Sequence, residues 1–256
     1  MKQAILVVSF GTTFPETREK NIGAVLRRTA SACPGIPVFE AWTSSMIRRA
    51  LQKRGEDVDD VPAALRRLAA NGFTDLYVLP THLLYGDEYD KMRGQLQAAA
   101  DSFHTVSVAA PLLSCDGDIR AVLRAVAAGT PTEPDEALVL MGHGTPHFCN
   151  TVYAAMDYHA KALGLSHVFI GTVEAFPDLD TLISSVHRSG CTRAVLAPLM
   201  LVAGDHANND MASDEPGSWK TRFTAAGIPA RAVIRGLGEY EPILDLYESH
   251  LKAILP

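Results

Sequence analysis

The sequence predicts an α/β protein made of two similar halves, each built on a parallel β-sheet. Two observations predict this fold class. Short apolar runs rich in β-branched residues alternate with stretches of helical spacing along the chain of 256 residues. In addition, three segments of the first half recur in the same order in the second half. A chain of this length can form two compact domains, each with a buried core.

Eight apolar runs have the length and composition of buried strands, and each is bounded by helix-breaking or turn residues. The predicted strands are Ala4–Phe10, Pro37–Trp42, Asp75–Pro80 and Thr105–Ala110 in the first half, and Ala137–Met141, His167–Thr172, Arg193–Met200 and Ala230–Ile234 in the second. Helical stretches are predicted at Thr151–Leu163, Leu179–Ser189 and Tyr240–Ile254. The last of these can pack on either half.

The internal repeat is recognisable in three pairs of segments, each at or just after the carboxyl end of a predicted strand. The pairs are Ser9–Thr12 with Gly142–Thr145, Phe39–Trp42 with Val173–Phe176, and Leu79–Glu88 with Ala197–His206. This alignment makes Glu40 the counterpart of Glu174 and Glu88 the counterpart of His206. Three matches in the same order are unlikely to arise by chance.

The stretch Gly129–Pro134 has the most linker-like composition in the chain, so we expect domains at residues 1–128 and 129–256. In parallel α/β sheets, ligands bind outside the carboxyl ends of the strands. The matched segments are therefore expected to line one ligand cleft between the two halves.

Composition excludes several classes of function. The net charge is −6, and no block of Lys and Arg is longer than a pair, so nucleic-acid binding is not expected. No apolar run approaches the roughly 18–20 residues that a membrane helix needs. The apolar run at the amino terminus is too short for a secretory signal, and the four cysteines are scattered without a CxxC pair, so a reducing cytoplasm is expected. Neither a P-loop nor a dinucleotide fingerprint is present, so no nucleotide cofactor is predicted.

Two histidines and one glutamate form a predicted metal site in the second half. His143 lies between two glycines, His206 lies in the matched loop that begins at Gly204, and Glu174 follows the strand between them. Imidazoles combined with a carboxylate suit Fe²⁺, Co²⁺, Ni²⁺ or Zn²⁺ better than Mg²⁺ or Ca²⁺. Two or three protein ligands leave positions open, which is typical of a delivery site and not of a structural metal. The flanking glycines would leave room for a large flat ligand above the imidazole of His143.

Several other polar residues are weaker candidates. Glu88 and Asp87 are expected to face the cleft, where a carboxylate could accept protons or attract a cation, although a solvated loop explains them equally well. His82 is expected to be a buried structural histidine. His159, His167, His187 and His250 are expected to form ordinary hydrogen bonds. The residues Asp205, Asn208, Asn209, Asp210 and Asp214 can steer cations or simply form turns.

The segments Val8–Thr12, Gly86–Tyr89, Met141–Gly144 and above all Pro198–Asp214 carry a resemblance to a known family. The chain closely resembles, from end to end, the anaerobic sirohydrochlorin cobaltochelatases of the early-insertion cobalamin pathway. The resemblance implies two flavodoxin-like domains, a fold related to that of protoporphyrin ferrochelatase, and ATP-independent insertion of Co²⁺ into sirohydrochlorin with release of two protons. It places the metal-binding residues at His143, Glu174 and His206, and a further catalytic glutamate at Glu88.

The same resemblance implies the partners. Sirohydrochlorin and a divalent metal ion are the expected substrates, with Co²⁺ as substrate metal, Fe²⁺ or Ni²⁺ as alternatives, and no prosthetic group. Because sirohydrochlorin carries eight carboxylates, nearby cations can bind it, with Arg18, Lys20, Lys91 and Arg93 as candidates. A cytoplasmic, biosynthetic role is implied, and a homo-oligomer is compatible with an enzyme of this size.

Three other functions remain open on the sequence. A sirohydrochlorin ferrochelatase for siroheme would share every feature above. A metal-dependent hydrolase is suggested by Gly142–His147, although the bridging carboxylate of a two-metal site is missing. A tetrapyrrole or metal carrier without catalysis would share the cleft and the ligands.

Overall fold

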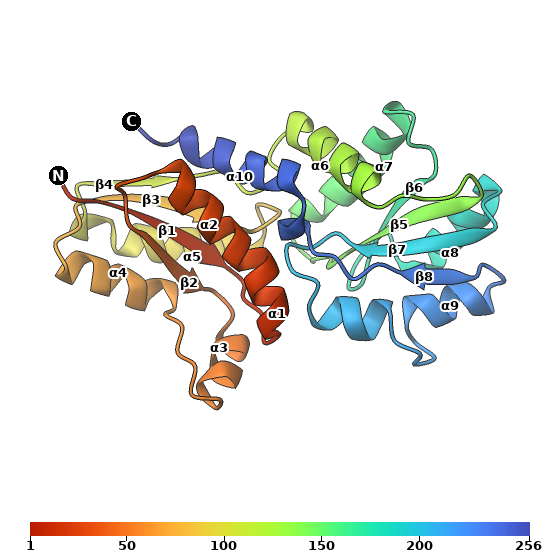
Figure 1. The fold of residues 1–256 in the computed structure, drawn as a ribbon, viewed down its shortest axis with the longest axis horizontal. Helices are drawn as coiled ribbons and strands as arrows, with labels where there is room; N and C mark the ends of the chain where they lie inside the picture. The colour runs from red at the N-terminus through yellow and green to blue at the C-terminus, as the bar shows by residue number, and fades with distance from the viewer. The chain divides into compact units, whose positions relative to one another are not determined.

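The computed structural model describes all 256 residues, which form two compact units. Unit 1 comprises Met1–Ser114 and Leu244–Pro256, and unit 2 comprises Cys115–Ile243. Each unit contains one four-stranded parallel sheet with helices packed against it (Figure 1). The predicted fold class and all eight predicted strands are confirmed. None of the helices is both long and apolar enough to span a bilayer.

Unit 1 is built on a sheet with the strand order β2-β1-β3-β4. Its strands are β1 (Gln3–Ser9), β2 (Val38–Trp42), β3 (Asp75–Pro80) and β4 (Thr105–Val108). Its helices are α1 (Pro15–Thr17), α2 (Gly23–Ala32), α3 (Ser45–Gln52), α4 (Val61–Ala70) and α5 (Asp87–Ala98), with a π-helical turn at Arg18–Ile22.

Unit 2 repeats this topology with the strand order β6-β5-β7-β8. Its strands are β5 (Glu136–Gly142), β6 (Val168–Thr172), β7 (Arg193–Pro198) and β8 (Ala230–Ala232). Its helices are α6 (Asp116–Gly129), α7 (Thr151–Ala162), α8 (Leu179–Ser189) and α9 (Trp219–Ala225), with a π-helical turn at Ala207–Met211. The final helix α10 (Glu241–Lys252) begins in unit 2 and ends in unit 1.

The strand order in each unit is that of the flavodoxin-like, doubly wound fold. In this order the connection direction reverses between the first and third strands, which are β1 and β3 in unit 1 and β5 and β7 in unit 2. Ligands bind such sheets at the carboxyl edge beside this switch point. The predicted flavodoxin-like architecture is therefore present twice.

The strands are continuous apolar runs in the sequence because both of their faces are buried. Every residue of β5 is buried, and so are six of the seven residues of β1. In unit 1, Ala4, Leu6 and Val8 pack against apolar residues of α4 and α5. In unit 2, Ala137, Val139 and Met141 pack against apolar residues of α8 and α9. Ile5, Val7, Leu138 and Leu140, which alternate with these residues along the strands, are also fully buried, so each sheet is closed to water on both sides.

The boundary between the units differs from the predicted division at residue 128. The stretch expected to be a linker is packed inside unit 2, where the hydroxyl of buried Thr130 lies 2.8 Å from the Tyr240 hydroxyl. The Arg235 guanidinium stacks on the Tyr240 ring at 3.8 Å. Helix α6 belongs to the same unit because its buried face packs beside α7. Gly129 ends helix α6, and a turn closed by the hydrogen bond from the Glu136 amide to the Glu133 carbonyl leads into β5. Composition alone cannot distinguish such a short connection from a linker between domains.

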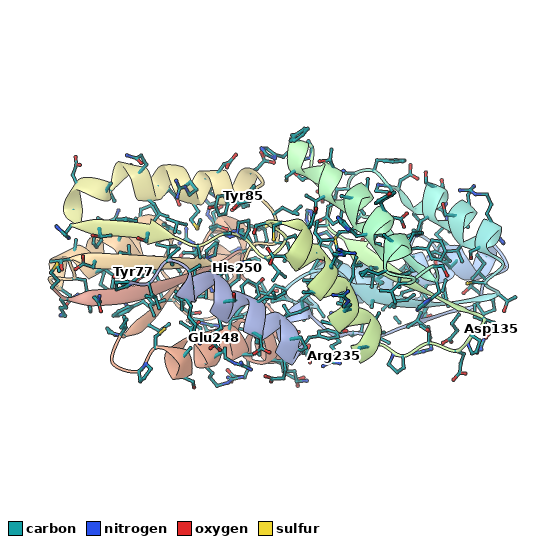
Figure 2. All side chains as sticks on the ribbon, turned by 90° about the horizontal axis from the view of Figure 1, so that it is seen from above. Tyr77, Tyr85, Asp135, Arg235, Glu248 and His250 are labelled. Atoms are coloured by element: carbon teal, nitrogen blue, oxygen red, sulfur yellow. The ribbon has the colours of Figure 1, made fainter.

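The end of the chain returns to unit 1, which corrects the assignment of residues 244–256 to the second half. The hydroxyl of buried Tyr247 donates a hydrogen bond of 2.8 Å to the Thr81 carbonyl. Glu248 pairs with Arg28 of α2 at 3.3 Å, and His250 Nδ1 lies 3.2 Å from the Ala110 carbonyl oxygen. Figure 2 labels Glu248 and His250 on this part of α10, beside the strands of unit 1.

Candidate metal centre

Three predicted site residues meet at the carboxyl edge of the unit 2 sheet. His143 follows β5 directly, Glu174 lies two residues beyond β6, and His206 lies in the helical segment after β7. Because these three strands are neighbours in the order β6-β5-β7, their ends bring the side chains together. One ligand atom from each residue lies within 4.8 Å of those of the other two. We call His143, Glu174 and His206 the metal trio.

The His143 loop is shaped by the two glycines that flank it. Gly144 has φ +86°, a backbone conformation that residues with side chains rarely adopt. A Cβ atom at Gly142 would lie 2.3 Å from the ring of Tyr153. Both positions therefore require glycine for steric reasons. The absence of side chains at these positions also leaves space around the imidazole.

The side chain of Tyr153 packs against this loop. Its side chain on α7 is buried, and burial raises its pKa to about 12, although hydrogen bonds from the backbone of Gly144 and His143 act in the opposite direction. The neutral phenol therefore persists at physiological pH and contacts the backbone of the residue that carries the imidazole.

Glu174 is held beside His143 by its backbone. The Glu174 amide donates a hydrogen bond of 2.9 Å to the His143 carbonyl, and Glu174 Oε2 lies 3.7 Å from His143 Nδ1. Asn150 links the two loops, because its side-chain oxygen accepts from the Thr145 amide at 3.1 Å and its side-chain amide donates to the Phe176 carbonyl at 2.7 Å.

Each imidazole has one nitrogen engaged by the protein. Nδ1 of His143 lies 2.8 Å from the Gly144 carbonyl oxygen, and Nδ1 of His206 lies 2.7 Å from Oδ2 of Asp210. Acceptors at these positions favour the Nδ1–H tautomer and leave Nε2 with its lone pair, as is usual for histidines that bind metals. The two rings are perpendicular, with centroids 4.7 Å apart.

The trio is open to solvent on one side, since the side chains of His143, Glu174 and His206 are 44%, 53% and 30% exposed. Two exposed aromatic side chains, Phe148 and Phe176, lie on the loops that follow β5 and β6. Two imidazoles and a carboxylate match the borderline-soft donor set predicted from the sequence. The arrangement can hold a divalent transition metal with coordination positions free for a second reactant.

The backbone of unit 1 repeats that of the metal centre. The Thr43 and Ser44 amides donate to the carbonyls of Ser9 and Phe10, just as the Val173 and Glu174 amides donate to those of Gly142 and His143. Gly11 has φ +104° and corresponds to Gly144. The helix after β3 begins at the same offset as the helix after β7, so Glu88 corresponds to His206.

This equivalence corrects one of the three aligned pairs. Trp42 pairs with Ser9 and Thr172 pairs with Gly142, so the counterpart of Glu174 is Ser44 and not Glu40. Glu40 lies inside β2 and pairs with Arg18 at 2.6 Å. The first half has three more residues between its first two strand ends, and the match of similar residues missed this insertion. The positions equivalent to the trio are therefore Phe10, Ser44 and Glu88, which do not form a metal-binding set.

The fourth predicted site residue, Glu88, lies in unit 1 in the first turn of α5 and forms an ion pair with Lys91 at 3.5 Å. Lys91 also donates to the Thr43 carbonyl at 3.0 Å. His82 lies between β3 and α5 with both ring nitrogens buried and without a protein partner. Burial lowers the pKa of His82 to about 4, with Glu88 and Lys91 as its charged neighbours.

The remaining candidates have mostly structural partners. Arg18 is engaged by Glu40 and stacks on Trp42, and Lys20 pairs with Glu16. Three histidines that were expected to form ordinary hydrogen bonds do so. His159 contacts Asp116, His187 contacts the Ala226 carbonyl, and His250 contacts the Ala110 carbonyl. In the acidic loop, Asp205 accepts from Asn209, Asn208 caps the Gly204 carbonyl and Asp214 pairs with Lys220.

Two residues that position the trio, Asn150 and Tyr153, were not among the sequence candidates, and Asp210 was named there only as one of a group that can steer cations or form turns. For Asp210 a signal existed, because it lies four residues after His206 and residues at this spacing share a helical face. No local pattern identifies Asn150 or Tyr153, since both act through backbone groups of distant loops.

The chain matches a known protein family over almost its whole length. The model of a family described as cobalt chelatase (CbiK) matches residues 3–255. The sirohydrochlorin cobaltochelatase of Salmonella typhimurium is 43% identical over 257 residues, which cover 100% of this chain and 97% of that protein. The sirohydrochlorin cobaltochelatase CbiKC of Nitratidesulfovibrio vulgaris is 34% identical, covering 98% of this chain and 90% of that protein.

Solved structures share the fold at lower sequence identity. The structure of SirB from Bacillus subtilis with Fe³⁺ has a TM-score of 0.69 and 15% identity, and covers 99% of this chain and 96% of that one. At this identity the likeness extends to the fold alone.

Proposed function

The chain belongs to the cobalt chelatase (CbiK) family, and from this premise we propose that it is a sirohydrochlorin cobaltochelatase of cobalamin biosynthesis. It is a chelatase that inserts Co²⁺ into sirohydrochlorin and releases two protons. Co²⁺ is a substrate of this reaction and not a resident cofactor. The four cysteines are all free, which supports the reducing cytoplasm expected from the sequence.

The observation that carries the proposal is the convergence of His143, Glu174 and His206, with ligand atoms within 4.8 Å of one another. Three donors bind a divalent ion and leave coordination positions for pyrrole nitrogens. The exposed rings of Phe148 and Phe176 offer apolar surface on the two loops that carry His143 and Glu174, which suits a flat macrocycle.

Insertion requires that two pyrrole N–H protons leave while four ring nitrogens replace the earlier ligands of the metal. As the metal moves to the macrocycle, Nε2 of His143 and the carboxylate of Glu174 regain their lone pairs and can accept those protons. The Glu174 side chain is 53% exposed, so protons that it accepts can pass on to solvent. Glu88 in unit 1 is proposed as a further proton acceptor, supported by its backbone equivalence to His206.

The test mixes the purified protein with sirohydrochlorin and Co²⁺ and follows the visible absorption change after subtraction of the rate without protein. We expect catalytic turnover that His206→Ala abolishes. His187→Ala is the matched control, because this histidine of the same unit contacts only the Ala226 carbonyl. Fe²⁺ and Ni²⁺ are compared in parallel, since the same donors also bind them.

Two outcomes would contradict the proposal. Stoichiometric binding of tetrapyrrole or metal without turnover would identify a carrier. Cleavage of a phosphoester that requires the trio would identify a metal-dependent hydrolase.

A further inference from the structure

The π-helical turn after β7 places a carboxylate behind one ligand of the metal trio. Asp210 Oδ2 lies 2.7 Å from Nδ1 of His206, and both residues lie in the segment that starts at Asp205 and continues as the π-helix Ala207–Met211. The contact is short, as expected when the acceptor is charged. His143 differs, because its Nδ1 faces the neutral carbonyl of Gly144.

We propose that Asp210 is a positioning residue for metal insertion, which accepts a hydrogen bond from Nδ1–H of His206 and so presents Nε2 to the metal. The inference rests on the proposed function, because it assumes that the trio binds the metal. A carboxylate behind a metal-binding imidazole fixes the tautomer and the ring orientation and increases the basicity of the ligand nitrogen.

Asp210 is the acidic residue of its segment suited to this role. The other carboxylate in the segment, Asp205, accepts from the side chain of Asn209 at 2.8 Å. Asn208 donates to the Gly204 carbonyl at 2.7 Å and so supports the start of the helix. These neighbours stabilise the turn, whereas the Asp210 carboxylate contacts the imidazole of His206.

The surroundings of Asp210 argue against a role in the core. Its side chain is 45% exposed and lines a hollow of about 290 Å³ together with residues of β6, α8 and α9. The nearest cation lining the same hollow, Arg222, is paired with Asp180. Removing the Asp210 carboxylate therefore removes no packing contact of the core, and its effect should be confined to His206.

The experiment compares Asp210→Asn with Asp205→Asn, which makes the same charge change in the same segment. Co²⁺ alone is titrated into each full-length protein, and affinity and coordination are read from the visible d–d absorption of the bound ion. We expect Asp210→Asn to weaken Co²⁺ binding by about 10- to 100-fold and to change the spectrum. Asp205→Asn should leave both unchanged.

A second measurement reads the tautomer directly. The ¹⁵N chemical shifts of the His206 ring should report an Nδ1–H tautomer in the wild type and its loss in Asp210→Ala. If one of the two variants, Asp210→Asn or Asp210→Ala, folds poorly, the other still decides the question. The role of Asp210 would be overturned if both Asp210 variants kept the Co²⁺ affinity, the spectrum and the tautomer of the wild type. If His206→Ala still lost Co²⁺ binding, the proposed function would stand. Co²⁺ binding that is unchanged in His206→Ala would overturn the proposed function as well.

Discussion

Each side chain of the metal trio is held in place by a hydrogen bond of a neighbouring group or of its own backbone. The Gly144 carbonyl engages His143, the Asp210 carboxylate engages His206, and the backbone amide of Glu174 donates to the His143 carbonyl. The convergence of the trio was predictable because each member follows the end of a predicted strand. Their supports were not, since a hydrogen bond to a distant backbone group leaves no pattern in the sequence.

The hydrogen-bond environment of His82 was also not predictable from the sequence. A buried structural histidine was expected at this position, and the structure buries both ring nitrogens but gives them no protein hydrogen-bond partner. Such an imidazole is most stable in its neutral form, because burial disfavours the charged form. Its environment therefore links the stability of the protein to pH.

We predict that the free energy of unfolding falls as the pH is lowered from about 6.5 to about 4. In this range the unfolded chain binds a proton at His82 whereas the folded protein does not, because burial lowers the pKa of His82 to about 4. The full loss is about 3 kcal/mol, at 1.36 kcal/mol for each unit of pKa shift. Urea unfolding at several pH values measures it.

The matched variants are His82→Leu and His187→Leu. The first should remove this part of the pH dependence, and the second, at an exposed histidine, should retain it. Equal pH slopes in the wild type and His82→Leu would contradict the prediction.

At the scale of elements, the three predicted helices and the eight predicted strands all agree closely with the structure. Buried parallel strands are apolar on both faces, so β3 begins and ends where the sequence predicts and the other strands differ by a few residues at their ends. Alignment of the repeats was less secure. The similar runs at Glu40 and Glu174 suggested equivalent positions, but β2 contains the first while the second lies beyond β6. Hydrogen-bond register, which a sequence match does not report, decides this equivalence.

The start of α9 provides a test at this scale. Buried Ser218 caps the helix by accepting from the Thr221 amide at 3.2 Å, and its hydroxyl donates to the Ser213 carbonyl at 2.7 Å. Ser218→Ala should lower the free energy of unfolding by about 1–2 kcal/mol, because it removes the cap and leaves the partly buried Ser213 carbonyl without its donor. Urea denaturation checks this, with exposed Ser249→Ala as a control that should be nearly neutral. A neutral Ser218→Ala would show that the cap is dispensable.

At the scale of the whole molecule, the number of units and their shared topology were predictable, but the path of the chain between them was not. A linker-like composition suggested a division at residue 128, whereas α6 belongs to unit 2 and the last residues belong to unit 1. Unit membership depends on which core an amphipathic helix joins, and periodicity shows that a helix has a buried face without identifying the surface that covers it.

The return of the chain to unit 1 predicts a localised loss of stability. Leu251 is fully buried in the part of α10 assigned to unit 1, so Leu251→Ala should cost about 2–5 kcal/mol. Hydrogen exchange should show faster opening of β1 and β3 with little change in β5 and β7. Lys252→Ala, at an exposed neighbour, should change neither region. Faster exchange confined to the unit 2 strands would contradict this assignment of the helix.

The backbone equivalence of Phe10, Ser44 and Glu88 with the metal trio has a consequence for ancestry. Gene duplication and fusion account for two halves with the same topology and the same register at their strand ends. Duplication leaves the same backbone in both copies, whereas the side chains at these positions differ: Phe10, Ser44 and Glu88 in one copy, and His143, Glu174 and His206 in the other. The two halves are thus distinguished at their strand ends by side chains and not by scaffold.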